Sequence, residues 1–204
     1  MCDVLASSLR AERVHDGCRY PGIKGLPREL QSCQHDSGGA GNTGLLDNII
    51  DISSIEANMV EVELQFDHFN NIVKDVKEVY EKKAKDKGLV FKVKTDLDLP
   101  KLKADSVKLK KVLNILTDNA VKFSQTGFVT ITTDYNPDKN LAVIQVKDTG
   151  PGIDPETLKS LLSSFQYGTQ NKTQIYEGKG IGLTLAHRFV SMMGGSISIN
   201  SQPE

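Results

Sequence analysis

The 204-residue sequence predicts a two-layer α/β sandwich, in which a mixed sheet carries helices on one face. Strand-like runs with apolar residues at alternate positions are interleaved with amphipathic helical segments, and this order is typical of the class. Two β-rich runs, 127–135 and 141–147, are joined by the turn-like Asn136-Pro137-Asp138 and predict a hairpin. The last predicted strand ends close to Glu204, so we expect the final antiparallel strand of the sheet to be missing.

Composition excludes several classes of protein. Hydrophobic residues make up 38% and charged residues 25%, which excludes a fully disordered chain. No apolar run approaches the roughly 20 residues that a bilayer crossing needs. The 25 basic and 26 acidic residues leave a formal charge of -1, which gives no bulk attraction for nucleic acid. The three cysteines show no zinc-ligand spacing, and we expect free thiols in a cytoplasmic chain.

The first 44 residues differ in texture from the rest. They contain seven of the 17 glycines and no sustained period of 2 or 3.6, so they predict a flexible or truncated leader. From residue 45 a helical stripe begins that could pack on a partner helix. Its apolar members are Leu45, Leu46, Ile49, Ile50, Ile52 and Ile55.

The middle of the chain alternates between the two periodicities. Residues 60–66 alternate apolar and polar and predict a strand, whereas 68–87 carry one apolar helical face that Gly88 ends. Residues 89–95 form a second β-rich run. Asp105 or Ser106 then caps a helix whose inward face consists of Leu109, Val112, Leu113, Leu116 and Ala120.

Beyond the hairpin the chain is rich in glycine for about 35 residues. A short helix is expected at 155–162 within this stretch. A longer helix over 182–193 ends at Gly194-Gly195, and a strand over 196–200 follows it. These elements complete the predicted sheet and its helical layer.

Polar side chains lie on the otherwise apolar helix that ends near Ser124. They are Asn114, Asn119 and Lys122. A buried amide without a hydrogen-bond partner costs about 1–3 kcal/mol, so each amide needs a backbone or ligand partner. Two interpretations are open, amides at the solvent edge of the helix or amides at a ligand site.

A glycine-containing turn, 148–153, directly follows a predicted strand. It reads Asp148-Thr149-Gly150-Pro151-Gly152-Ile153. Glycines let the backbone approach a flat ligand closely, and a carboxylate at a strand end can accept hydrogen bonds from an exocyclic amine. An ordinary Asp-Gly turn is the alternative, although such a turn needs only one glycine.

A second glycine-rich segment opens a helix. It reads Gly178-Lys179-Gly180-Ile181-Gly182-Leu183. Amide groups at a helix N-terminus without side-chain bulk bind phosphate, and the helix dipole favours the negative charge. A simple hinge is the alternative. The segment lacks the Gly-Lys-Ser/Thr ending of a P-loop and does not follow a strand, which argues against a dinucleotide-binding fingerprint.

In this order the three segments resemble the N, G1 and G2 boxes of the GHKL ATPase superfamily, which has the Bergerat ATP-binding fold. More narrowly, they resemble the catalytic domain of sensor histidine kinases. Residues 119–124 and Gly127 carry the narrower likeness, and 186–197 are similar to the closing helix and strand of that family. The resemblance covers about 45–202. It implies a leader at 1–44, the end of a dimerisation helix at 45–58, and an ATP-binding catalytic domain at 59–204 that is truncated at its C-terminus.

The resemblance implies ATP and Mg²⁺ as the bound groups. Asn119 would hold Mg²⁺ against the phosphates, Lys122 would face phosphate, and Asp148 would bind the adenine amino group. Gly150, Gly152 and Ile153 would accommodate the ring, and Phe165 would anchor the base of a mobile lid at 163–181. The residues expected around the phosphates are Gly178, Lys179, Gly180, Ile181, Gly182 and Leu183.

The implied activity is that of an ATP-dependent protein-histidine kinase. The γ-phosphoryl group of ATP would pass to a histidine on the dimerisation helices of the same or a partner chain, and from there to an aspartate of a response-regulator receiver domain. The resemblance implies a homodimer for the intact protein, of which this chain would be a cytosolic part.

Two departures from the family pattern stand out. Family members carry an amide or acid four residues before the magnesium asparagine, where this chain has Ile115. Asn114 lies one position away, which rotates its side chain by about 100° around the helix. His15 with Asp16 echoes the phospho-acceptor pattern with one residue too many, in a segment without helical character, and we interpret it as a leader histidine.

Ile115 keeps a second function open, a degenerate, non-catalytic nucleotide-binding regulatory module of the same fold. ATPases of the gyrase, Hsp90 and mismatch-repair types are a third class. These use a catalytic glutamate in the N box, and the segment 114–124 contains none.

Overall fold

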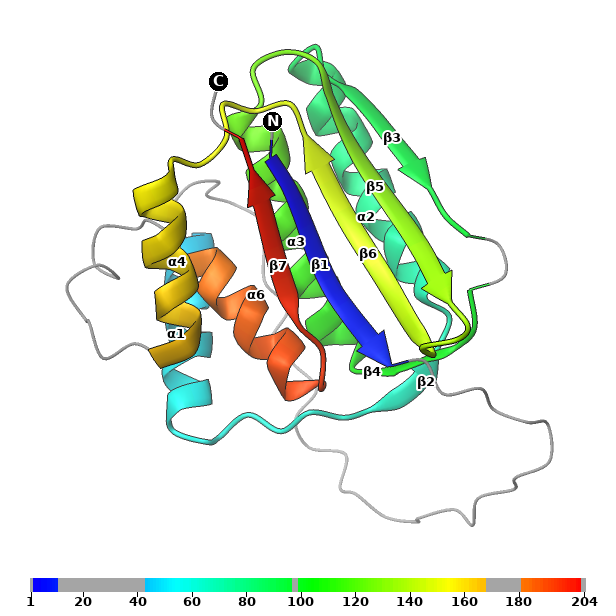
Figure 1. Ribbon diagram of the computed structural model, residues 1–204, viewed down its shortest axis with the longest axis vertical. Coiled ribbons are helices and arrows are strands. Elements are labelled where there is room, and N and C mark those ends of the chain that lie inside the picture. The colour runs from blue at the N-terminus through cyan, green and yellow to red at the C-terminus, as the bar shows by residue number, and fades with distance from the viewer. Residues whose placement is uncertain (1, 11–42, 97–98, 168–180, 203–204) are drawn as a thin grey trace.

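The computed structural model describes residues 2–10, 43–96, 99–167 and 181–202 of the chain (Figure 1). In chain order the elements are β1 Cys2–Arg10, α1 Thr43–Glu56, β2 Gln65–Asp67, α2 Phe69–Asp86, β3 Val90–Lys94, β4 Leu102–Ala104, α3 Ser106–Phe123, β5 Phe128–Asn136, β6 Leu141–Asp148, α4 Pro155–Tyr167, α6 Ile181–Met192 and β7 Ile197–Ser201.

The elements form the two layers that the sequence predicts. Five strands pair in the order β3-β5-β6-β1-β7, and β2 and β4 form a separate two-stranded sheet. The pairing is mixed, since β3 and β5 are parallel and the other pairs of the large sheet are antiparallel. Figure 1 shows α2, α3 and α6 together on one face of the large sheet.

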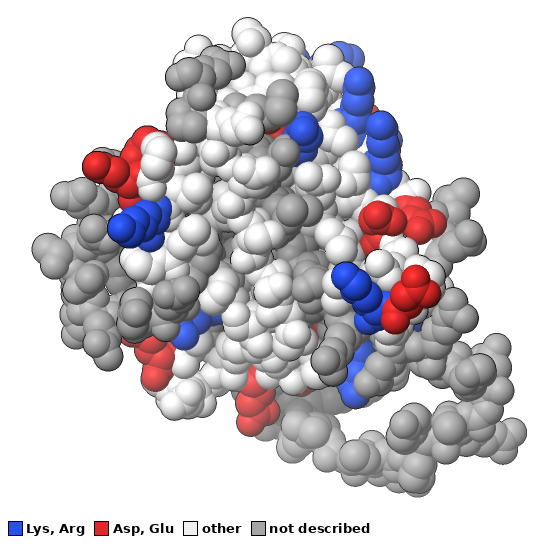
Figure 2. Space-filling view, in the orientation of Figure 1, with Lys and Arg blue, Asp and Glu red and all other residues white. Residues whose placement is uncertain are grey.

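The predicted hairpin is confirmed as β5 and β6. Their register runs from Val129 opposite Asp148 to Asn136 opposite Leu141. Alternate residues of both strands face the helices and are fully buried, such as Ile131 and Ile144. The outer face carries half-buried side chains such as those of Thr132 and Gln145. In Figure 2 the described residues near the centre of this view are mostly uncharged, and the described acidic and basic side chains lie mainly toward its margin.

The N-terminal strand β1 differs from the leader expected at 1–44. It lies between β6 and β7 and pairs antiparallel with both. Its sequence has weak local strand character, but an added strand satisfies backbone groups that β6 and β7 would otherwise leave unpaired, and tertiary pairing overrides local preference. The remainder of the predicted leader, 11–42, lies outside the described residues, and so does His15.

Other predicted boundaries shift by a few residues or more. The strand expected at 60–66 is reduced to β2, which pairs only with the three residues of β4. The short helix expected at 155–162 continues as α4 to Tyr167. Gly88 adopts φ of +76° immediately after the C-cap of α2, as its predicted role as a helix stop requires. Within the described residues, no helix has the length and apolarity needed to cross a bilayer.

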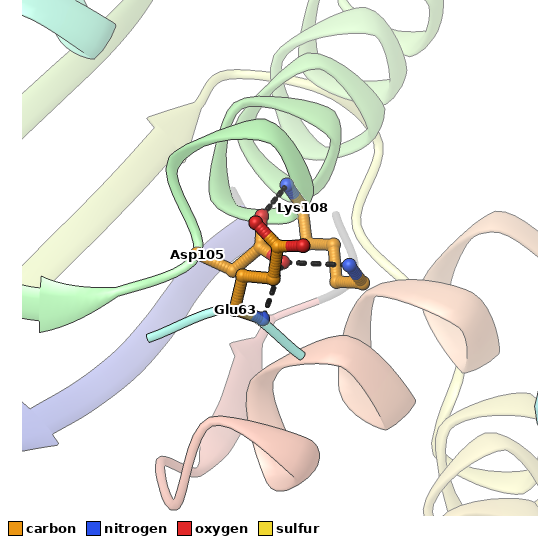
Figure 3. A network of polar contacts seen from close by, with 3 residues as sticks. All are labelled: Glu63, Asp105 and Lys108. Carbon is orange, nitrogen blue, oxygen red and sulfur yellow. Dashed lines mark hydrogen bonds and ion pairs between the residues drawn. The ribbon is translucent and has the colours of Figure 1, made fainter. Parts of the chain in front are cut away.

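A buried carboxylate fixes the start of α3 (Figure 3). Asp105 is 5% exposed and caps the helix by accepting a hydrogen bond from the Lys108 N–H at 3.0 Å. It also accepts from the Lys108 ammonium at 2.6 Å and from the Glu63 N–H at 3.2 Å. Burial raises the pKa of Asp105, but these donors outweigh burial and hold the pKa below its usual value.

We expect Asp105→Ala to lower the free energy of unfolding by about 2 kcal/mol at pH 7, because it removes the cap and leaves its donors without their acceptor. The folded pKa is depressed, so this stabilisation is present above the unfolded pKa near 3.8 and is lost as pH falls through the folded value. Urea denaturation of both proteins at pH 7 and below pH 4 measures the difference. Asp138→Ala, in an exposed turn, is the control, and a loss equal to that of Asp105→Ala would contradict the assignment.

Candidate functional site

The first predicted site segment lies on α3, the helix at the centre of the helical layer. Its inward face is fully buried, including Leu113 and Leu116. Asn114, Ile115 and Asn119 are half-buried at the edge of this face, and Lys122 is exposed at the last turn. No hydrogen bond joins the Asn119 side chain to another described residue. A polar amide is therefore held at the margin of the core and is available to a ligand.

The second segment begins where β6 ends. Asp148 is 7% exposed, and its Oδ1 accepts a hydrogen bond from the Gly150 N–H at 2.8 Å. A Cβ atom on Gly150 would lie 2.9 Å from that oxygen and 3.5 Å from the backbone carbonyl of Phe123. Gly150 therefore packs between the buried carboxylate and the C-terminal end of α3, in a space that a side chain would fill.

The third segment reaches α3 from the opposite direction. A Cβ atom on Gly182, at the start of α6, would lie 3.0 Å from Cγ2 of Ile115. Ile115 and Asn119 are four residues apart on one helical face. The N-terminus of α6 thus meets α3 one turn before Asn119, and the turn after β6 meets α3 four residues beyond it.

The three segments therefore converge on one side of α3. Of the other predicted residues, Ile181 is buried and Leu183 packs against the same core, so both anchor α6. Gly152 has φ of +78°, and Ile153 donates its N–H to the Ser201 hydroxyl oxygen at 2.7 Å. The backbone of Phe165 lies in α4, but its side chain falls outside the described part of the structure. Also outside it are Gly178, Lys179 and Gly180.

Thr149, which belongs to no predicted site role, holds the turn after β6 in place. The Thr149 hydroxyl donates to the Thr126 carbonyl at 2.7 Å and accepts from the Phe128 N–H at 2.9 Å. It occupies the space beside Gly127, where a Cβ atom would lie 2.3 Å from Thr149 Oγ1. Gly127 also has φ of +93°. The start of β5 therefore packs closely against the turn after β6, with Gly127 on one side of the contact and the Thr149 hydroxyl on the other.

A lysine at the end of α2 holds the last turn of α3. The Lys87 ammonium donates to the carbonyl oxygens of Val121 at 2.8 Å, Lys122 at 2.7 Å and Ser124 at 3.1 Å. These carbonyls lie at a helix C-terminus, where the backbone lacks helical partners and the dipole favours a cation. Lys87 thereby positions the turn that carries Lys122, whose ammonium lies 5.3 Å from the centre of the Phe123 ring. No sequence motif identifies this contact.

Residues 104–204 match the model of a protein family described as "Histidine kinase-, DNA gyrase B-, and HSP90-like ATPase". This match shows that residues 104–204 belong to this ATPase family, and the curated relatives that the chain resembles are sensor kinases. A curated relative, the autoinducer 2 sensor kinase/phosphatase LuxQ of Vibrio vulnificus strain YJ016, is 29% identical over 163 residues. That alignment covers 78% of this chain but only 19% of the relative.

Two solved structures share the fold. Full-length ShkA in complex with AMPPNP superposes with a TM-score of 0.62 at 22% identity, covering 79% of this chain and 36% of ShkA. The histidine kinase ThkA in complex with the response regulator TrrA gives a TM-score of 0.54 at 21% identity, with coverage of 79% and 48%. The predicted fold class is therefore confirmed.

Proposed function

We propose that this chain is the ATP-binding catalytic part of a two-component sensor histidine kinase. The observation that carries the proposal is the convergence on α3, where Gly150 packs beside Asp148 and the end of the helix while Gly182 packs on Ile115. A purine amino group would bind the Asp148 carboxylate. A triphosphate would extend along α3 toward the start of α6, where helix N-terminal amides favour anions.

The residues present fit a magnesium ion held between protein and nucleotide. Asn119 supplies a neutral amide oxygen, a ligand that suits a hard cation, and no described side chain competes for it. Among the described residues, no group of three acidic, histidine or cysteine side chains forms a metal site. Mg²⁺ commonly binds through one or two protein ligands together with substrate phosphates. When bound, it would neutralise charge on the phosphates during phosphoryl transfer.

In the intact protein the γ-phosphoryl group would pass to a histidine of dimerisation helices, supplied by the same chain or a homodimer partner, and then to a receiver aspartate. α1 would represent the end of such a helix. Its exposed apolar side chains, Leu46, Ile49 and Ile50, support a helical partner. The alternative function, a regulatory module that binds nucleotide without transferring phosphate, is favoured by one specific observation. Ile115 fills the position against Gly182 where an amide or acid is expected.

Isothermal titration of the chain with ATP, with and without Mg²⁺, tests the proposed site. We expect Mg²⁺ to strengthen ATP binding, and Asn119→Ala to reduce this gain about tenfold, because a hydrogen-bonding or ligand group to a charged partner contributes about 1.5–3 kcal/mol. Asn114→Ala is the matched control, since it removes the same amide from a different side of α3. If Asn114→Ala abolished the magnesium effect and Asn119→Ala did not, the metal assignment would be wrong.

A further inference from the structure

The N-terminal strand is the sole connection between β7 and the rest of the described sheet. β1 pairs with β6 from Cys2 opposite Asp148 to Arg10 opposite Leu141, and with β7 from Cys2 opposite Ser201 to Ala6 opposite Ile197. Figure 1 shows β1 (blue) lying between β7 (red) and β6 (yellow). Among the described strands, β7 therefore joins the sheet only through β1.

The position of β1 is defined mainly by backbone groups. A strand inside an antiparallel sheet directs its N–H and C=O groups to both neighbours, so it is recognised through its backbone and its direction. The flanking strands contribute buried apolar side chains, Ile144 and Val146 from β6 and Ile197 from β7. The register with β6 shifts between Ala6 and Ser8, and the pairing with β7 stops at Ala6. The two-sided part of the position therefore takes five residues.

We propose that the space between β6 and β7 is a strand-acceptor site. Its ligand is an extended peptide segment that runs antiparallel to both neighbours, and residues 2–10 of the same chain occupy it. Such strand addition gives affinity through main-chain hydrogen bonds. Because the pairing is made by backbone groups, we expect the same nine-residue segment supplied as a separate peptide to bind in its place.

The acceptor site ends at the proposed nucleotide site. Cys2 lies opposite Asp148 on one side and opposite Ser201 on the other. The Ser201 hydroxyl oxygen accepts the hydrogen bond from the Ile153 N–H. An occupied acceptor site therefore holds the end of β7 against the turn 148–153, and we expect an empty one to weaken nucleotide binding. This consequence, unlike the acceptor site itself, depends on the proposed function.

Disulfide trapping tests the occupant and its register. In a chain with Cys2, Cys18 and Cys33 replaced by serine, Val4→Cys/Ile199→Cys joins directly opposed positions, and Asp3→Cys/Asn200→Cys joins the adjacent pair. Adjacent residue pairs in an antiparallel sheet alternate between hydrogen-bonded and non-hydrogen-bonded geometry. The Cα atoms of the two kinds of pair lie at different distances, so at least one of these two cysteine pairs suits a disulfide. The control, Val4→Cys/Ser198→Cys, is displaced by one residue and places the thiols on opposite faces.

We expect an intrachain disulfide in at least one registered pair, at a yield about ten times that of the control or more. Equal yields in the registered and control pairs would overturn the proposal. A disulfide-linked dimer in place of the intrachain product would overturn the assignment of the strand to its own chain. Gel mobility with and without reductant separates these outcomes.

A second experiment asks whether the site accepts a separate peptide. Val4→Pro/Ala6→Pro removes two strand N–H groups, whereas the control Val4→Thr/Ala6→Ser keeps them. We expect the proline variant to exchange the β7 amide hydrogens about tenfold faster or more, as for a locally opened segment, while α2 and α3 stay protected. The synthetic peptide of residues 2–10 should restore protection, and the same peptide with both prolines should not.

Unchanged protection of β7 in the proline variant would overturn the proposal, and so would a failure of the peptide to restore lost protection. If α2 and α3 also lose protection, the proline variant has unfolded more widely, and the disulfide yields then decide whether β1 occupies the acceptor site. Calorimetry with ATP is run on the same samples. Restored β7 protection without any ATP binding in any sample would contradict the proposed function and leave the acceptor site supported.

Discussion

Replacing Asp148 by Asn is expected to lower the affinity for ATP by about 10- to 100-fold, because a hydrogen bond to a charged group contributes about 1.5–3 kcal/mol and 1.4 kcal/mol is a factor of ten. The substitution keeps the size of the side chain, and the amide oxygen can still accept from the Gly150 N–H. It replaces one acceptor oxygen by a donor, however, and a donor cannot pair with the exocyclic amine of adenine.

The measurement is calorimetric titration with ATP and with inosine triphosphate, which lacks that amine. The wild-type chain should prefer ATP, and Asp148→Asn should lose most of this preference while its affinity for inosine triphosphate changes little. Asp138→Asn, an equivalent change in an exposed turn, is the matched control. Equal ATP affinity in the wild type and Asp148→Asn would show that this carboxylate does not bind the base.

Elements defined by contacts near in sequence are predictable here, and those defined by distant partners are not. The hairpin of β5 and β6 follows from two alternating runs and a turn. Helix α2 follows from one apolar face and the glycine that stops it. β1 could not be predicted, because its pairing depends on β6 and β7, which lie more than 130 residues away in the sequence. The alternation of apolar and polar residues at 60–66 predicted a longer strand than β2, because β4 pairs with only three residues.

The same distinction applies to the site. The motifs around Asn119, Asp148 and Gly182 are each local, and their order along the chain carries the resemblance that implies a nucleotide site. The contacts that hold the motifs together are not local. Thr149 fits against Gly127, and the Lys87 ammonium binds the end of α3, but neither contact leaves a periodicity or a motif in the sequence. These supporting contacts required the structure.

Gly127→Ala is expected to destabilise the fold by about 3 kcal/mol or more, since left-handed backbone strain costs about 1–3 kcal/mol and a buried steric clash adds to it. The added Cβ would lie 2.3 Å from Thr149 Oγ1 at a residue whose φ is +93°. The hydroxyl cannot move aside freely, because it bridges the Thr126 carbonyl and the Phe128 N–H.

A double variant separates the two causes of the destabilisation, which are the steric clash with Thr149 and the positive φ of residue 127. In Gly127→Ala/Thr149→Ala the hydroxyl is absent and only the positive φ opposes the new side chain, so part of the loss should be recovered relative to the two single variants. Gly194→Ala is the matched control, because Gly194 has φ of +77° but no atom within 4 Å of an added Cβ. Urea denaturation should therefore give a larger loss at Gly127 than at Gly194. Equal losses would mean that backbone strain alone selects glycine at Gly127, and that the fit between β5 and the turn after β6 does not depend on Thr149.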